Sequence, residues 1–189
     1  ISKVGDHYEF GDYPQTHYMV EDGDLDVDDK HLGALQEKCG DALMILEEYA
    51  DAASKYMHAM GNADSSEEAY ADLRLKYAQA LEADGSHGDS DKETDIARAF
   101  AAAAGEFIAR DRDEEAIAIM RNAAKHFEDA GEIDLAEKAY STLIFELAKA
   151  GKEETAAPLC LEAYDVYGAS RNFATLFTNG ALPYYESIE

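Results

Sequence analysis

Tryptophan is absent from this 189-residue sequence, which contains only 2 cysteines and 3 prolines. Two cysteines, Cys39 and Cys160, are too few for a disulfide framework and favour a reducing, cytoplasmic setting. The scarcity of proline leaves most of the chain free to be helical. No apolar run approaches the roughly 18 residues of a membrane span, and no basic-then-apolar signal segment opens the sequence. These absences predict a cytoplasmic protein that does not span a membrane.

Basic residues are also scarce. The chain has 16 lysines and arginines against 41 aspartates and glutamates, and its formal net charge is -25. Nucleic acids and anionic membrane surfaces are bound by dense basic patches, so we expect neither as a partner. An acidic surface of this kind would steer a basic peptide towards the protein. The alternative is that the acidic residues serve only solubility or adaptation to salt.

An internal repeat organises the second half of the chain. Three blocks, 113–132, 133–152 and 153–172, align without gaps. The blocks share four apolar columns, which are Ala116/Ala136/Ala156, Met120/Tyr140/Cys160, Ala123/Leu143/Ala163 and Phe127/Leu147/Tyr167. Apolar positions separated by four, three and four residues form one face of an α-helix, and Gly131 and Gly151 are typical helix C-caps. Each block therefore predicts one helix and one tight turn, with consecutive helices antiparallel.

The same spacing extends towards the N-terminus and predicts about eight helices. Their ranges are 31–47, 49–61, 65–83, 93–110, 113–129, 133–150, 154–168 and, more weakly, 171–179. For residues 1–30 the sequence predicts an acidic, tyrosine-rich arm with a short strand near 7–10. For residues 171–189 it predicts a capping helix and a tail. We therefore expect an all-α fold, an α-solenoid of antiparallel hairpins over 31–170. An irregular helical bundle with the same amphipathic period is the alternative.

Two segments resemble the tetratricopeptide repeat family of stacked helical hairpins. The first matches at Cys39-Gly40, Leu43, Tyr49, Ala52, Tyr56 and Ala59. The second matches at Ala123-Ala124, Phe127, Gly131, Ile133, Ala136, Tyr140 and Leu143. The resemblance covers about residues 31–170, although hairpins in the second half repeat every 40 residues or so rather than every 34. It implies a groove, formed by the first helix of each hairpin, that binds a peptide or protein segment.

If the eight helices pair in order, the family's groove-facing positions fall on the first, third and fifth helices. The candidate peptide-binding residues are then Lys38, Asp41, Asp72, Gln79, Arg121, Asn122 and Lys125. On the fifth helix, Arg121 and Lys125 lie one turn apart with Asn122 between them, a set that suits a carboxylate or phosphate. It resembles in part the carboxylate clamp of the family, although Asp41 stands where a clamp has asparagine. The alternative is a solvated face paired with Glu114, Glu115, Glu128 or Asp129.

No glycine-rich phosphate loop, nucleophile elbow or metalloprotease motif is present. The 6 histidines include no i, i+4 pair, and the aspartate runs near 22–33 and 84–95 depart from the EF-hand pattern. Both cysteines and the tyrosines Tyr70, Tyr77 and Tyr140 occupy helix-packing positions. We therefore expect no enzyme activity, no cofactor and no metal site.

The expected function is a non-catalytic interaction module that binds an unidentified protein or peptide. One alternative is a regulatory sensor that binds a small ligand or short peptide in the groove, for which an enclosed pocket would argue. Another is an enzyme or accessory whose chemistry lies in residues 1–30 or in another chain. Apolar Phe173, Leu176 and Phe177 near the C-terminus would also allow a homodimer through a terminal helix.

Overall fold

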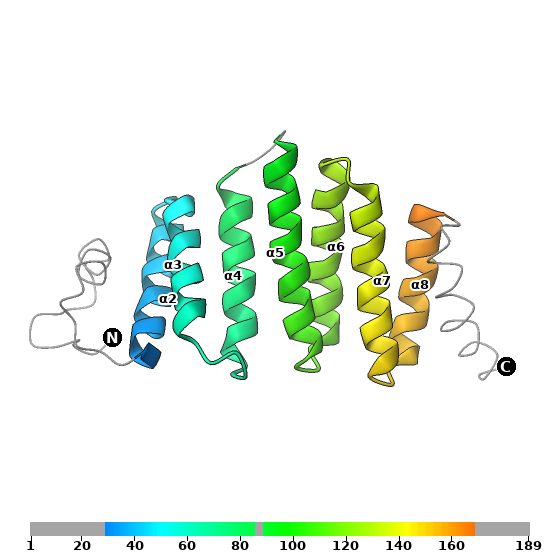
Figure 1. Cartoon of the computed structure of the whole chain (residues 1–189), viewed down its shortest axis with the longest axis horizontal. Coiled ribbons are helices and arrows are strands. Elements are labelled where there is room, and N and C mark those ends of the chain that lie inside the picture. Colours follow the sequence, from blue (N-terminus) through cyan, green and yellow to red (C-terminus); the bar gives the residue numbers. More distant parts are fainter. Residues whose placement is uncertain (1–28, 86–88, 169–189) are drawn as a thin grey trace, which may run out of the picture. The chain divides into compact units, whose positions relative to one another are not determined.

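The computed structural model describes residues 29–85 and 89–168, and every regular element in these ranges is an α-helix (Figure 1). The helices are α2 (Asp29–Ile45), α3 (Tyr49–Asn62), α4 (Ala69–Ala83), α5 (Ser90–Ile108), α6 (Asp113–Asp129), α7 (Ile133–Lys149) and α8 (Glu153–Tyr167). The predicted all-α, helical-repeat fold is confirmed for this part of the chain. The predicted N-terminal arm, its strand and the helix at 171–179 lie outside the described residues.

The chain divides into two compact units after Gly85. The N-terminal unit holds α2, α3 and α4, with α3 packed against both of the others, and the C-terminal unit holds α5 to α8, each packed on the next. The sequence prediction paired the helix at 113–129 with the one at 133–150. Within the C-terminal unit that pairing is wrong, because α6 packs more extensively on α5 than on α7. Consequently α6 is the second helix of its hairpin, not the first.

Two side chains explain where helix boundaries differ from the prediction. The Asp64 carboxylate accepts hydrogen bonds from the backbone N–H and the hydroxyl of Ser66, both at 2.8 Å. This local turn competes with helix formation, so α4 begins at Ala69 rather than at residue 65. In contrast, α5 begins early, at Ser90, because the Asp89 carboxylate caps the helix by accepting from the N–H groups of Asp91 and Lys92.

The predicted apolar columns form the core of the C-terminal unit. Ala116, Ala136, Leu147 and Cys160 have no exposed surface, and the other members are buried too except Tyr167. Tyr167 is half-buried, and its hydroxyl donates to Glu128 at 2.6 Å. Cys39 and Cys160 are free thiols within the core, as predicted, and burial raises the pKa of the Cys160 thiol. None of the helices described is both long and apolar enough to cross a membrane.

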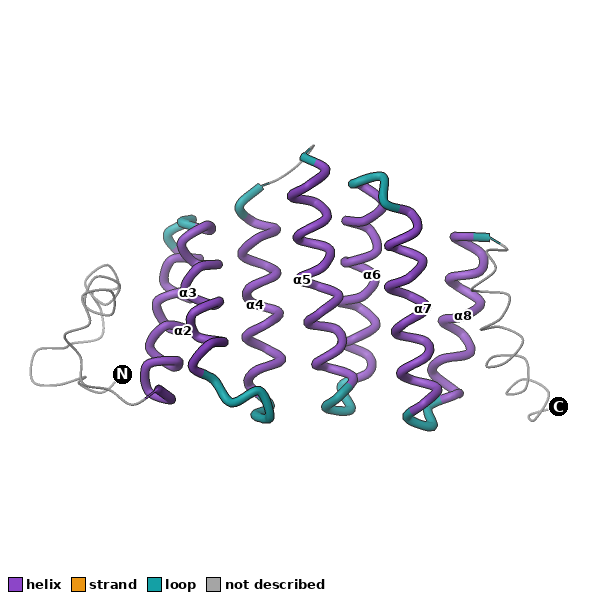
Figure 2. Tube along the Cα trace, in the orientation of Figure 1, coloured by secondary structure: helices purple, strands orange, loops and turns teal. Residues whose placement is uncertain are grey.

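Four of the turns between described helices, drawn as teal loops in Figure 2, share one hydrogen-bonding pattern. A backbone N–H donates at 2.7–3.0 Å to the carbonyl five residues earlier, in the pairs Glu48–Leu43, Arg112–Phe107, Glu132–Phe127 and Lys152–Leu147. The residue before each donor has a positive φ: Glu47 at 61°, Asp111 at 58°, Gly131 at 80° and Gly151 at 75°. These are Schellman turns. The glycine C-caps at 131 and 151 are therefore confirmed, and Glu47 and Asp111 occupy the same place without being glycine.

Glu47→Gly is expected to raise the free energy of unfolding by about 0.5–1 kcal/mol. A side chain in the left-handed region costs roughly 1–2 kcal/mol, part of which is offset by the greater freedom of glycine in the unfolded chain. Urea denaturation measures the change. Glu48→Gly is the matched control, because it removes the same side chain at a negative φ of -91° and should destabilise. Equal effects of the two substitutions would contradict the prediction.

Candidate functional site

The predicted binding residues fall into two groups, one in each compact unit. On α2 and α4, Lys38 and Gln79 are exposed, whereas Asp41 and Asp72 are half-buried. The structure brings Lys38 and Asp41 together, with Nζ and Oδ2 3.8 Å apart. Gln79 forms no hydrogen bond with another described residue. The other three residues, Arg121, Asn122 and Lys125, all lie on α6.

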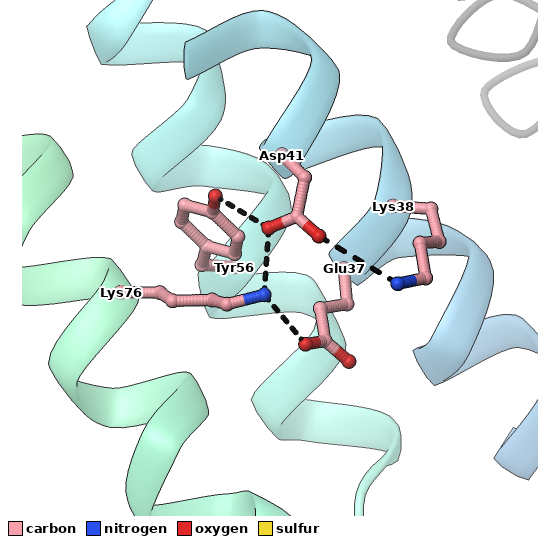
Figure 3. Close-up of polar contacts among 5 residues, drawn as sticks. All are labelled: Glu37, Lys38, Asp41, Tyr56 and Lys76. Carbon is pink, nitrogen blue, oxygen red and sulfur yellow. Dashed lines mark hydrogen bonds and ion pairs between the residues drawn. The ribbon is translucent and has the colours of Figure 1, made fainter. Parts of the chain in front are cut away.

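Asp41 is the centre of a polar cluster that joins the three helices of the N-terminal unit (Figure 3). Its Oδ1 accepts hydrogen bonds from the Tyr56 hydroxyl of α3 at 3.0 Å and from Lys76 Nζ of α4 at 2.7 Å. Lys76 Nζ also donates to Glu37 Oε1 at 2.8 Å. We call Glu37, Lys38, Asp41, Tyr56 and Lys76 the Asp41 cluster. Sequence reasoning found Asp41 and missed its partners Tyr56 and Lys76, because nothing local in the sequence links them.

The surroundings of Tyr56 and Lys76 in the Asp41 cluster keep both side chains protonated. Burial, reinforced by Asp41 and Glu37, raises the pKa of Tyr56 far above its ordinary value, so the phenol stays a donor. Burial opposes the charge on Lys76, but hydrogen bonds to Asp41 and Glu37 outweigh it and raise the pKa of the ammonium group. Lys76 therefore remains a cation that is tied to α2.

An open cavity of about 370 Å³ adjoins the cluster at Glu37. It lies at the end of the unit where α2 and α4 begin and α3 ends. Its walls are formed by Gly33, Ala34, Glu37, Ala59, Asn62, Ala63, Asp64, Glu67, Ala69, Tyr70 and Leu73. Small apolar residues dominate the walls, and carboxylates provide most of their polar groups. The volume is at the lower end of the roughly 300–1,000 Å³ range of ligand pockets.

Sequence reasoning did not identify this cavity. Tyr70 was assigned to helix packing, whereas it lines the cavity, and its hydroxyl accepts a hydrogen bond from Arg74 at 3.1 Å. In the helices and turns that the structure describes, no group of three or more histidines, cysteines or carboxylates is placed to hold a metal ion.

On α6, the predicted carboxylate-binding residue is already bound to a carboxylate of the same chain. Arg121 Nε and Nη2 donate to the two oxygens of Glu162 on α8, at 2.8 and 2.6 Å. The alternative expectation of pairing with nearby acids on α6 is wrong for Arg121, since its partner is 41 residues away. Asn122 is half-buried, and Lys125 is exposed without an ion pair to any described residue. We call Arg121, Asn122 and Lys125 the α6 stripe. Within it, only Lys125 carries a charge that is not paired with another described residue.

The hydrogen bonds with Arg121 lower the pKa of Glu162. Burial, together with Glu162, raises the pKa of the adjacent Tyr140, whose hydroxyl donates to Glu162 at 3.3 Å, to about 12. The lowered pKa of Glu162 means that the ion pair stabilises the fold near neutral pH. This contribution is lost as the pH falls through the folded-state pKa.

Arg121→Gln is therefore expected to lower the free energy of unfolding at pH 7 by less than about 1 kcal/mol, because both side chains are partly exposed. The deficit should shrink as the pH falls below the usual carboxylate range, about 4. Urea denaturation at several pH values measures it. Lys125→Gln makes the same charge change without losing an ion pair and should have little effect. A deficit that stays constant down to low pH would contradict this account.

The sequence matches no protein-family model and no curated protein.

Proposed function

We propose that this protein is a non-catalytic, tetratricopeptide-like interaction module that binds a peptide or protein segment. The observation that supports the proposal best is the open cavity among α2, α3 and α4. Binding grooves in helical-repeat proteins receive side chains of a segment that lies across neighbouring helices. Here helices from one compact unit provide a small apolar cavity with a polar rim, which is a suitable place for an anchoring side chain.

The predicted residues on α6 and the cavity of the N-terminal unit do not support the proposal equally. The α6 stripe offers Lys125, but Arg121 would have to release Glu162 before it could bind an acidic ligand. The cavity needs no such exchange, because its volume is open to the surface.

A small-ligand sensor is the second candidate function, favoured by the size of the cavity, which is within the range that binds small molecules. Its openness favours a peptide instead.

The proposal is tested by selecting random twelve-residue peptides on the full chain and measuring the affinities of the enriched peptides by fluorescence anisotropy. Ala34 is exposed and lines the cavity, so Ala34→Trp should fill it and weaken binding at least about tenfold, or about 1.4 kcal/mol. Ala50→Trp is the matched control, on an exposed site outside the cavity. Arg121→Glu/Lys125→Glu should also retain binding.

Three outcomes would count against the proposal. Failure to enrich any peptide would overturn peptide binding. Equal affinity of wild type and Ala34→Trp would move the site away from the cavity. Loss of binding only in Arg121→Glu/Lys125→Glu would assign it to the α6 stripe.

A further inference from the structure

We infer that the cavity of the N-terminal unit accepts a basic side chain, lysine or arginine, from the bound segment. This inference rests on the proposed function and adds the chemistry of the anchor. The cavity wall includes three acidic residues, Glu37, Asp64 and Glu67, and no lysine or arginine among the described residues that line it. An anchoring residue should therefore carry a positive charge.

The walls also match the rest of a basic side chain. Lysine and arginine combine an apolar stem with a charged head, and they bury the stem along apolar surface. Ala34, Ala63 and Leu73 offer such a surface between the carboxylates. A neutral apolar anchor would fit the walls but would remove water from the carboxylates without replacing their hydrogen bonds, which is costly.

Hydrogen bonds hold the Glu37 and Asp64 carboxylates in place. Lys76 donates to Glu37 at 2.8 Å, and Ser66 donates twice to Asp64 Oδ1 at 2.8 Å. A group that is fixed before binding loses less conformational freedom when a ligand arrives. Two cations that contact lining residues have partners as well: Lys76 is shared between Glu37 and Asp41, and the Arg74 guanidinium lies 5.1 Å from the centroid of the Tyr70 ring.

The electrostatic field around the cavity is negative, like the charge of the residues that line it. Helices α2 and α4 begin at the cavity, and helix N-termini carry only about half a positive charge each, which the three lining carboxylates outweigh. The net charge of -25 also draws a basic segment towards the protein from a distance. An acidic segment would be repelled both by the carboxylates that line the cavity and by the net negative charge of the protein.

The test uses the peptides selected on the full chain. We expect one lysine or arginine to recur among them, and its replacement by norleucine, which keeps the stem and removes the charge, to weaken binding about tenfold. Glu67→Lys in the protein should weaken binding of the parent peptide by a similar factor. Glu68→Lys is the matched control, with the same charge change at the neighbouring exposed residue outside the cavity lining, and should change affinity less than about threefold.

A charge exchange sharpens the test. A peptide with glutamate in place of the anchor should bind Glu67→Lys more tightly than it binds wild type. If peptides bind at the cavity without a recurring basic residue, or if Glu68→Lys weakens binding as much as Glu67→Lys, the basic anchor is wrong while peptide binding stands. If no peptide is enriched, the proposed function fails and this inference fails with it.

Discussion

Gly40→Ala is expected to lower the free energy of unfolding by about 3 kcal/mol, the upper end of the usual cost of overpacking. A Cβ atom at this position would lie 2.6, 2.8 and 2.9 Å from three ring atoms of Tyr56. The ring cannot readily move aside, since Tyr56 is only 2% exposed and its hydroxyl is bonded to Asp41. Glycine at position 40 thus lets α2 and α3 approach each other over the tyrosine ring.

Gly61→Ala and Gly105→Ala provide the controls. Both glycines lie within helices, and a Cβ atom at either would meet nothing within 4 Å. Because alanine favours helix more than glycine does, these substitutions should raise stability by up to about 1 kcal/mol. Urea denaturation followed by circular dichroism measures all three variants. A Gly40→Ala protein as stable as the controls would show that the Tyr56 ring has room to move.

Breaking the buried Glu93–His126 hydrogen bond is expected to cost about 1–3 kcal/mol of unfolding free energy. Glu93 Oε2 of α5 and His126 Nδ1 of α6 are 2.6 Å apart, and their side chains are 5% and 7% exposed. The imidazole also stacks on Phe100, with ring centroids 5.8 Å apart and planes within 4°. Glu93→Leu removes the carboxylate and leaves the imidazole buried without it, so the loss should be large.

Two further variants separate the pair from simple packing. Glu93→Gln keeps a hydrogen-bonding group of the same size and should lose less than Glu93→Leu. In Glu93→Leu/His126→Phe both polar groups become apolar, so most of the lost stability should return, since replacing both partners of a buried polar pair by apolar groups can be nearly neutral. Thermal and urea unfolding of wild type, Glu93→Leu, His126→Phe and the double variant complete a double-mutant cycle. A double variant as unstable as the sum of the single ones would refute this interpretation.

The helices could be predicted because apolar periodicity and helix-ending glycines involve residues that are close together in the sequence. The column containing Ala116, Ala136 and Ala156 follows from helical periodicity, and Gly131 and Gly151 follow from the geometry of a helix end. The α4 start was missed because the Asp64–Ser66 turn is a short side-chain feature inside a sequence that otherwise favours helix.

The candidate site was less predictable, because its contacts join distant residues. The sequence indicated Asp41, but its bond to Lys76 spans 35 residues, and the bond between Arg121 and Glu162 spans 41. Such pairs depend on how helices pack, and the assumed pairing of α6 with α7 was wrong. The cavity was missed for the same reason, since residues of α2, α3 and α4 form its walls only after packing.

The repeated turns also bear on how the gene can change. Removing residues 113–152 would join Arg112 to Glu153 and so bring α8 directly after α5. Arg112 and Lys152 have similar backbone angles before their helices, with φ/ψ of -94°/60° and -107°/48°. The column residues of α8 would then take the places of those of α6, with Ala156 for Ala116 and Cys160 for Met120. Deletion or duplication of these two consecutive helices by unequal recombination would thus keep the same turn geometry before each remaining helix of the C-terminal unit, so that the number of helices can differ among descendants of one ancestral gene.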